Sequence, residues 1–291
     1  MPKASATDQP HPHRFDTAAP VAATVHVEVG TVRVTATDRN DTVVTVRPSD
    51  SANTGDVKAA AQTRVECAGG FLRVRAPRTR SLFGRSPSIT VDVELPTGSS
   101  LDGRSAVGDF DCRGHLGEVR IKASVGDLRV AHADSVDLST HGAVTADRVE
   151  GDAAFTTGSG EIRAGRVGGA CDVKNSNGNT RVDDVAGALT LRIANGQVVV
   201  GRAHSSVTSR SANGSVRIDE VVRDKTTVET SAGNIEIGIR EGSAAWLDVK
   251  STMGRVYTDL TDSAGPGDAE EAVEVRAYTT MGSITVRRSP V

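Results

Sequence analysis

The sequence has few aromatic residues and few cysteines. Aromatic residues make up 3% of its 291 residues, so a globule packed around aromatic side chains is not expected. Cys67, Cys112 and Cys171 form no Cys-x-x-Cys pair and leave one thiol over, which argues against both a disulfide framework and a zinc site. We therefore expect three reduced thiols in buried positions.

Segments that would insert into a membrane or direct export are also missing. No stretch reaches the roughly 18 apolar residues of a membrane-spanning helix. Residues 1–15 are polar and lack the apolar core, about 7–15 residues long, of a secretory signal. The sequence thus predicts a cytoplasmic protein without membrane insertion, and leaves a non-standard export route open.

Charge patterning and motifs exclude several functions. The net charge is −3 and acidic residues alternate with arginines, so no nucleic-acid footprint is expected. The seven histidines show no His-Glu-x-x-His spacing, and the chain has no Gly-x-Ser-x-Gly or Walker motif. We predict no catalytic residue, no metal ligand and no cofactor.

Thirty glycines are present, and many begin a repeated unit in which the second and fourth following residues are apolar or small. From Gly142 to Gly214 the spacing is 18 residues at every step, and beyond Gly214 the steps lengthen. A fixed period of this length indicates a solenoid. The repeat glycines are Gly108, Gly126, Gly142, Gly160, Gly178, Gly196, Gly214, Gly233, Gly254 and Gly282.

Each unit alternates apolar and polar residues, which is typical of a half-buried strand. A second glycine, such as Gly169 or Gly187, introduces another alternating run, so each coil has two strands. The predicted fold is all-β, a parallel β-solenoid of about ten coils. Pairs expected to face inward are Leu128 and Val130, Ile162 and Ala164, Val198 and Val200, Val216 and Ile218, Ile235 and Ile237, and Ile284 and Val286.

Three regions follow from this pattern. Residues 1–19 are expected to be a disordered polar tail, and residues 101–288 to form the solenoid repeats. Residues 20–100 contain irregular β-strand patterns with turn signals between them, and only residues 56–62 have a helical pattern. We expect this N-terminal β region to cap the first coil, since an open solenoid end exposes strand edges and core side chains.

Three turns repeat an Asn-Gly dipeptide at 18-residue spacing. Stacked coils would align Asn177, Asn195 and Asn213, and their amides would hydrogen-bond along the stack as in cross-β amide ladders. We interpret them as structural residues that fix the register.

Two surface features are candidates for contact with a partner. Arg129, Arg163, Arg181 and Arg217 share one outward register, interrupted by Thr145 and Val199. They form either a cationic stripe or a face neutralised by nearby acids such as Asp127 and Glu161. Separately, the loop 78–87 places Leu82 and Phe83 among three arginines, which fits either a contact with a partner or packing on its own domain.

Several passages resemble the bacterial β-strand-repeat family labelled "putative adhesin", a domain of unknown function related to autotransporter adhesin head domains. They are Val-Gly-Thr-Val at 29–32, Ile-Thr-Val-Asp-Val-Glu-Leu-Pro-Thr-Gly at 89–98, and the later Thr-Met-Gly and Ser-Ala-Asn-Gly turns. The resemblance spans about residues 20–288. It implies a β-solenoid with a non-enzymatic interaction role.

Two hypotheses of function follow. The first is a monomeric, rigid interaction platform for a protein or cell-envelope partner. The second is a self-assembling cytoplasmic scaffold similar to bactofilins, in which coils stack end to end between molecules. The expected caps, at the N-terminus and in the insertion 259–274, favour the platform. A minor alternative is a polysaccharide-acting enzyme using carboxylates such as Asp183.

Overall fold

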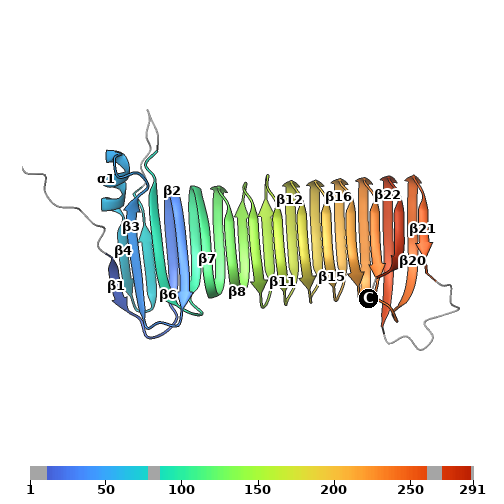
Figure 1. Ribbon diagram of the computed structural model, residues 1–291, viewed down its shortest axis with the longest axis horizontal. Coiled ribbons are helices and arrows are strands. Elements are labelled where there is room, and N and C mark those ends of the chain that lie inside the picture. Colours follow the sequence, from blue (N-terminus) through green and yellow to red (C-terminus); the bar gives the residue numbers. More distant parts are fainter. Residues whose placement is uncertain (1–11, 78–85, 261–270, 290–291) are drawn as a thin grey trace, which may run out of the picture.

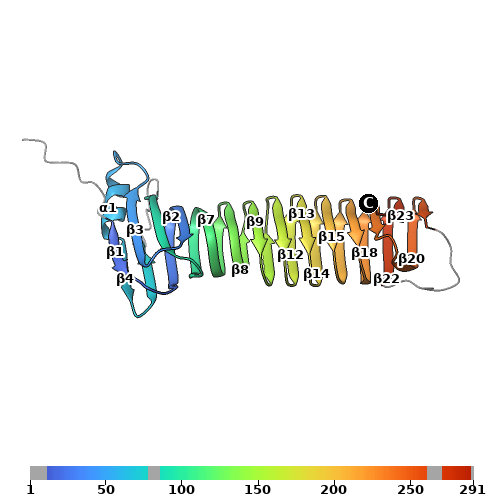
Figure 2. The ribbon, with the colours of Figure 1, turned by 60° about the horizontal axis from the view of Figure 1, so that its bottom comes forward.

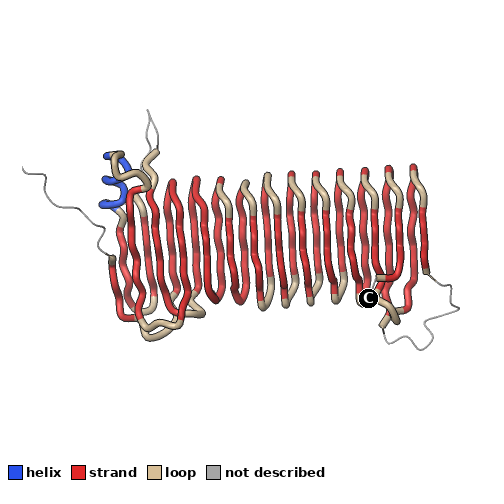
Figure 3. Tube along the Cα trace, in the orientation of Figure 1, coloured by secondary structure: helices blue, strands red, loops and turns tan. Residues whose placement is uncertain are grey.

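The computed structural model describes residues 12–77, 86–260 and 271–289. They form a rod of stacked β-strands with one helix at its N-terminal end (Figures 1 and 2). Strands fill the long faces and turns line the edges between them (Figure 3). Neighbouring coils pair in parallel, as between β12 (Cys171–Asn177) and β14 (Leu189–Asn195), so the predicted parallel β-solenoid is confirmed.

Two rows of parallel strands make the two faces of the rod. The first sheet contains β10 (Ala153–Thr157), β12, β14, β16 (Val207–Asn213), β18 (Asp224–Ala232), β22 (Ala272–Met281) and β20 (Ala244–Met253). The second sheet contains β9 (Val144–Val149), β11 (Ile162–Val167), β13 (Thr180–Val185), β15 (Val198–Ala203), β17 (Val216–Val221), β19 (Ile235–Ile239), β23 (Ile284–Arg288) and β21 (Val256–Asp259). Three long strands pass through both sheets: β2 (Ala22–Thr37), β7 (Ser100–Val125) and β8 (Leu128–Thr140).

The core is a narrow column of aliphatic side chains between the sheets. Alternate residues of each strand point inward. Leu191 in β14 and Val200 in β15 are fully buried, and all twelve residues predicted to face inward are at most 2% exposed. Apolar burial along this column is the main stabilising contribution.

Glycines form a second column, at the edge where the chain passes from the first sheet to the second. At Gly178 the backbone φ is +137°, and a Cβ would lie 2.1 Å from the carbonyl oxygen of Gly160 in the preceding coil. Only glycine fits there. In spatial order the column is Gly30, Gly108, Gly126, Gly142, Gly160, Gly178, Gly196, Gly214, Gly233, Gly282 and Gly254.

Inward-facing polar side chains donate hydrogen bonds to the carbonyl oxygens of this glycine column. Asn175 uses its Nδ2 for two such bonds, 3.1 Å each, to the oxygens of Gly160 and Gly178. The next coil has Ile193 at the equivalent position, which has no donor. Asn175 therefore supplies the bond that Ile193 cannot make. Single bonds of this kind come from Thr140, Thr157, Thr230, Ser251 and Thr279.

The predicted asparagine ladder is confirmed. The Nδ2 of Asn195 donates to the Oδ1 of Asn177, and the Nδ2 of Asn213 donates to the Oδ1 of Asn195, both at 3.0 Å. Each amide thus links two adjacent coils and fixes their register.

The N-terminal end is closed by antiparallel strands and a helix. Here β3 (Asp41–Pro48) pairs with β6 (Ile89–Pro96), β4 (Arg64–Ala68) with β5 (Phe71–Arg75), and β1 (His13–Asp16) with β3. The helix α1 (Thr54–Gln62) contacts β3 and β6, and Asn53 caps it. Strand β1 lies in the segment expected to be a disordered tail, and there Phe15 packs against the core.

The N-terminal region also contributes coils. Strand β2 runs parallel to β5 and β6 on one side and to β7 on the other. The first coil in the chain is therefore second in space, after the coil formed by β5 and β6. The region predicted as a cap supplies both coils and their cover.

The C-terminal end has the same exchange of order. Strands β22 and β23 lie between the coil of β18 and β19 and the coil of β20 and β21. The glycines therefore do not stack in the order of the sequence here: Gly282 stacks on Gly233, and Gly254 comes last.

The three cysteines are free thiols. Cys112 and Cys171 are buried and Cys67 is half-buried. Burial raises the pKa of the Cys171 thiol to about 12, and it raises the pKa of Cys112 further. The expectation of reduced, buried thiols is confirmed for two of the three.

Candidate interaction surface

The outward side of the second sheet holds the predicted arginines in one row. Strand register aligns each with its neighbour one coil away. We call this row the arginine column; in order it contains Arg129, Thr145, Arg163, Arg181, Val199 and Arg217.

Three of the four arginines are neutralised by an acid two positions away in the sequence. Residues two positions apart share a face of a strand, so an acid at that spacing reaches the guanidinium. The pairs are Arg163–Glu161 (2.9 Å), Arg181–Asp183 (2.6 Å) and Arg217–Asp219 (2.6 Å). The column is therefore a row of dipoles and not a cationic stripe.

Arg129 differs from the other three. It has no ion pair with another residue that the structure describes. The nearby Asp127, expected to neutralise it, instead accepts a hydrogen bond from the backbone N–H of Ala143 at 2.8 Å. Asp127 thus binds the turn of the next coil.

A second outward row alternates aspartate with glycine. Asp183, Gly201 and Asp219 follow one another on β13, β15 and β17. A Cβ on Gly201 would lie 2.3 Å from the carbonyl oxygen of Asp183, so that position cannot hold a side chain. The aspartates are two coils apart, about 9.6 Å, with a gap between them.

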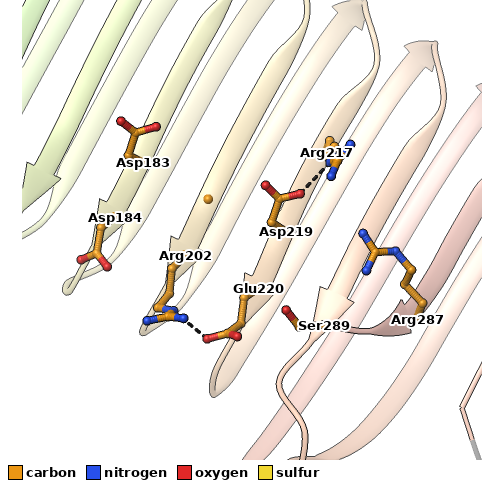
Figure 4. A pocket seen from close by; sticks show the side chains of 9 residues that line it. Asp183, Asp184, Arg202, Arg217, Asp219, Glu220, Arg287 and Ser289 are labelled. Carbon is orange, nitrogen blue, oxygen red and sulfur yellow. Dashed lines mark hydrogen bonds and ion pairs between the residues drawn. The ribbon is translucent and has the colours of Figure 1, made fainter. Parts of the chain in front are cut away.

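This gap is part of a shallow groove of about 450 Å³. Figure 4 shows Arg217 pointing toward Asp219, and Arg202 toward Glu220 on the neighbouring strand. The Arg202–Glu220 distance is 2.7 Å. The lining residues are Asp183, Asp184, Gly201, Arg202, Arg217, Asp219, Glu220, Arg287 and Ser289.

A cluster of histidines lies nearer the N-terminus on the same sheet. The rings of His115 and His132 stack with their centroids 4.1 Å apart. The Nε2 of His132 lies 2.7 Å from Glu150, whose carboxylate also accepts a hydrogen bond from Arg148. Hydrogen bonds from Arg148 and His132 lower the pKa of Glu150 to about 2.

The carboxylates of this surface lie in ion pairs on an open face. The general acid of a glycosidase such as lysozyme lies instead in an apolar pocket that raises its pKa. Within residues 12–77, 86–260 and 271–289, no group of three or more His, Cys, Asp or Glu side chains is placed to hold a metal ion. In the same ranges, no helix has the length and apolar character needed to cross a bilayer.

Sequence reasoning found part of this surface. Of the four predicted arginines only Arg217 lines the groove. Arg181 does not line it but forms an ion pair with Asp183, which does. Leu82 and Phe83 lie outside the described residues. The acids Asp219 and Glu220 were missed, although the spacing of Arg217 and Asp219 on one strand was readable.

The chain belongs to the Toastrack DUF4097 family, whose model matches residues 24–287. No curated protein matches the chain. The family match confirms the resemblance read from the turns and strand motifs.

Several solved structures match the chain over most of its length. One described as a "putative adhesin" from Parabacteroides merdae ATCC 43184 is 11% identical with a TM-score of 0.43, covering 96% of each chain. One with the same description from Bacteroides fragilis NCTC 9343 is 10% identical with a TM-score of 0.35, covering 96% of this chain and 98% of that one. A "Putative lipid binding protein" from Parabacteroides distasonis ATCC 8503 is 11% identical with a TM-score of 0.32, covering 96% and 97%.

Proposed function

We propose that this protein is a non-enzymatic, rigid interaction platform that binds a protein or cell-envelope partner through the second sheet. The observation that supports this most is the row of arginine–acid pairs beside the groove. The sheet fixes the spacing of these charges, so little side-chain order must be gained on binding.

Charge pattern, more than net charge, would give the surface its specificity. Exposed ion pairs contribute only about 0–1 kcal/mol each to stability. Charges arranged in a complementary pattern do select partners and speed their encounter. A partner with two basic groups about 9.6 Å apart would match Asp183 and Asp219 on either side of Gly201.

The experiment exchanges one ion pair without changing the net charge. In the double variant Arg181→Asp/Asp183→Arg, the pair is kept and its direction is reversed. The matched control is Asp172→Lys/Lys174→Asp, an i, i+2 pair on the first sheet at 3.5 Å. Immobilised full-length wild type and both variants are exposed to the cell-envelope fraction of the organism of origin.

Components retained by wild type and control but lost with the reversed pair would support the proposal, and are then tested as purified binders in a salt series. Equal capture by all three proteins would contradict binding through this face. Turnover of polyuronides that is abolished by Asp183→Asn would instead support the enzymatic alternative.

We also propose that the platform works in the cytoplasm and reaches envelope partners from that side. Three unpaired cysteines suit a reducing compartment. Labelling intact cells with a membrane-impermeant maleimide tests this: Cys67, the most accessible thiol, should react only after lysis.

A further inference from the structure

The N-terminal end of the rod is closed to solvent. Strands β3 and β4 and helix α1 cover it, and Val74 in β5 and Val91 in β6 beneath them are 0% exposed. The outermost strands there, β1 and β4, have four and five residues. Short edges of this kind offer little template for pairing with another chain.

At the C-terminal end, by contrast, the apolar interior meets solvent. The last coil is formed by β20 and β21 (Figure 1). Val256 in β21 is 41% exposed, although Ile284, the next residue inward in the same column, is 0% exposed. Leu247 and Val249 in β20 are only partly buried.

Both strands of this last coil also have an open hydrogen-bonding edge. Among the described residues, β20 pairs only with β22, and β21 only with β23. Half of the backbone N–H and C=O groups of an edge strand point away from its sheet. The ten residues of β20 and the four of β21 thus present two open strand edges at the same end, each able to pair with a strand of another chain.

We propose that this end binds the same end of a second copy, forming a head-to-head dimer of two rods. A twofold axis perpendicular to the rod turns one copy onto the other and reverses the strands, so the facing edges pair antiparallel. Both edges and the apolar interior are covered in one step. Because the opposite end of each rod is closed, assembly stops at two copies.

A second copy fits this end better than other occupants. A single extended peptide covers one edge only and leaves the interior exposed. The chain's own residues 261–270 offer Ala264, Pro266 and Ala269 as their only apolar side chains, which are small for covering Leu247 and Val256. The dimer interface lies at the end of the rod, so the inference goes beyond the proposed platform on the second sheet.

The test is sedimentation velocity of the full-length chain from about 0.1 to 100 µM, a range that spans micromolar dissociation constants. The expected result is a reversible change from 30.2 kDa to twice that mass. A monomer at every concentration would overturn the proposal. Species larger than the dimer would also overturn it, because they require pairing at the N-terminal end.

Two variants and a matched control locate the interface. Val256→Lys and Thr258→Lys each place an inward-pointing charge on the edge strand, a change that blocks edge pairing. Each should raise the dimer dissociation constant at least about tenfold, or 1.4 kcal/mol. The control Val125→Lys changes another exposed valine, 53%, far from this end, and should leave the dimer dissociation constant unchanged.

Hydrogen exchange checks the same point without a substitution. The amides of β20 and β21 should exchange more slowly as concentration rises, while those of β9 to β15 stay constant. A dimer that forms without protecting β20 and β21, or that Val125→Lys weakens as much as Val256→Lys does, would show that the copies meet elsewhere.

Discussion

The double hydrogen bond of Asn175 allows a quantitative test of how the coils are joined. In Asn175→Thr, the hydroxyl can keep the bond to Gly160, as Thr157 does for Gly142, but the bond to Gly178 is lost. The carbonyl of Gly178 is then a partly buried acceptor without a donor. Its desolvation should lower the free energy of unfolding by about 1–3 kcal/mol.

A second substitution should recover this loss. Ile193→Thr alone removes buried apolar surface and should cost about 1–2 kcal/mol. In the background of Asn175→Thr, the new hydroxyl at position 193 replaces the donor that Gly178 lost. The double variant should therefore be more stable than the sum of the two single effects predicts, with a coupling free energy of about 1–3 kcal/mol.

The assay is urea unfolding followed by circular dichroism, with the four proteins forming a double-mutant cycle and equal m-values required for the comparison. The control combines Thr157→Val with Ile193→Thr. Because the hydroxyl of Thr157 donates to Gly142 in another coil, the effects of these two substitutions on stability should be additive. Additivity within about 0.5 kcal/mol for Asn175→Thr/Ile193→Thr would refute the shared donor.

Three further predictions follow from the described contacts. Asn195→Asp can accept the bond from Asn213 but cannot donate along the ladder, and should lower stability by about 0.5–1.5 kcal/mol in urea unfolding. Gly201→Ala places a Cβ 2.3 Å from a backbone oxygen and should lower the Tm by several degrees or more. In the control Gly69→Ala, the added Cβ has no other atom within 4 Å, so the substitution should cost only backbone strain. The free energy of unfolding should fall above pH 9, the ordinary thiol pKa, because Cys112 and Cys171 ionise in the unfolded chain but stay neutral when buried. Each thiol should lower it by about 1.4 kcal/mol per pH unit, up to the pKa of that thiol in the folded protein.

Each of these has an outcome that would contradict it. A stability of Asn195→Asp equal to wild type would mean that the ladder amides do not bond in solution. A Gly201→Ala melting point no lower than that of Gly69→Ala would show that the coils can separate at that point. An alkaline slope that Cys171→Ala leaves unchanged would assign the pH dependence to other groups.

Local pattern was enough to predict the repeating part of the fold. The step of 18 residues between Gly142 and Gly214 fixes one coil, and the alternation around it fixes which side chains enter the core. The asparagine ladder followed because stacking identical coils aligns identical residues. These features repeat, so each coil supplies the same information as the last.

The two ends and the groove were not predictable in this way. Whether Gly282 or Gly254 stacks on Gly233 depends on which strand pairing is more stable, and both carry the same Thr-Met-Gly turn. The groove depends on the position of Gly201 between Asp183 and Asp219, which is visible only when three coils are placed side by side. Such choices rest on contacts between residues distant in sequence.

The exchanged order of the end coils changes how the rod would respond to mechanical load. Tension applied to the chain before β2 and after β23 would act on coils that have a neighbour on each side. A solenoid stacked in chain order would lose its outermost coil first, one strand pair at a time. Here the loaded coils must shear against two partners at once, so rupture should need a higher force and proceed in one cooperative event.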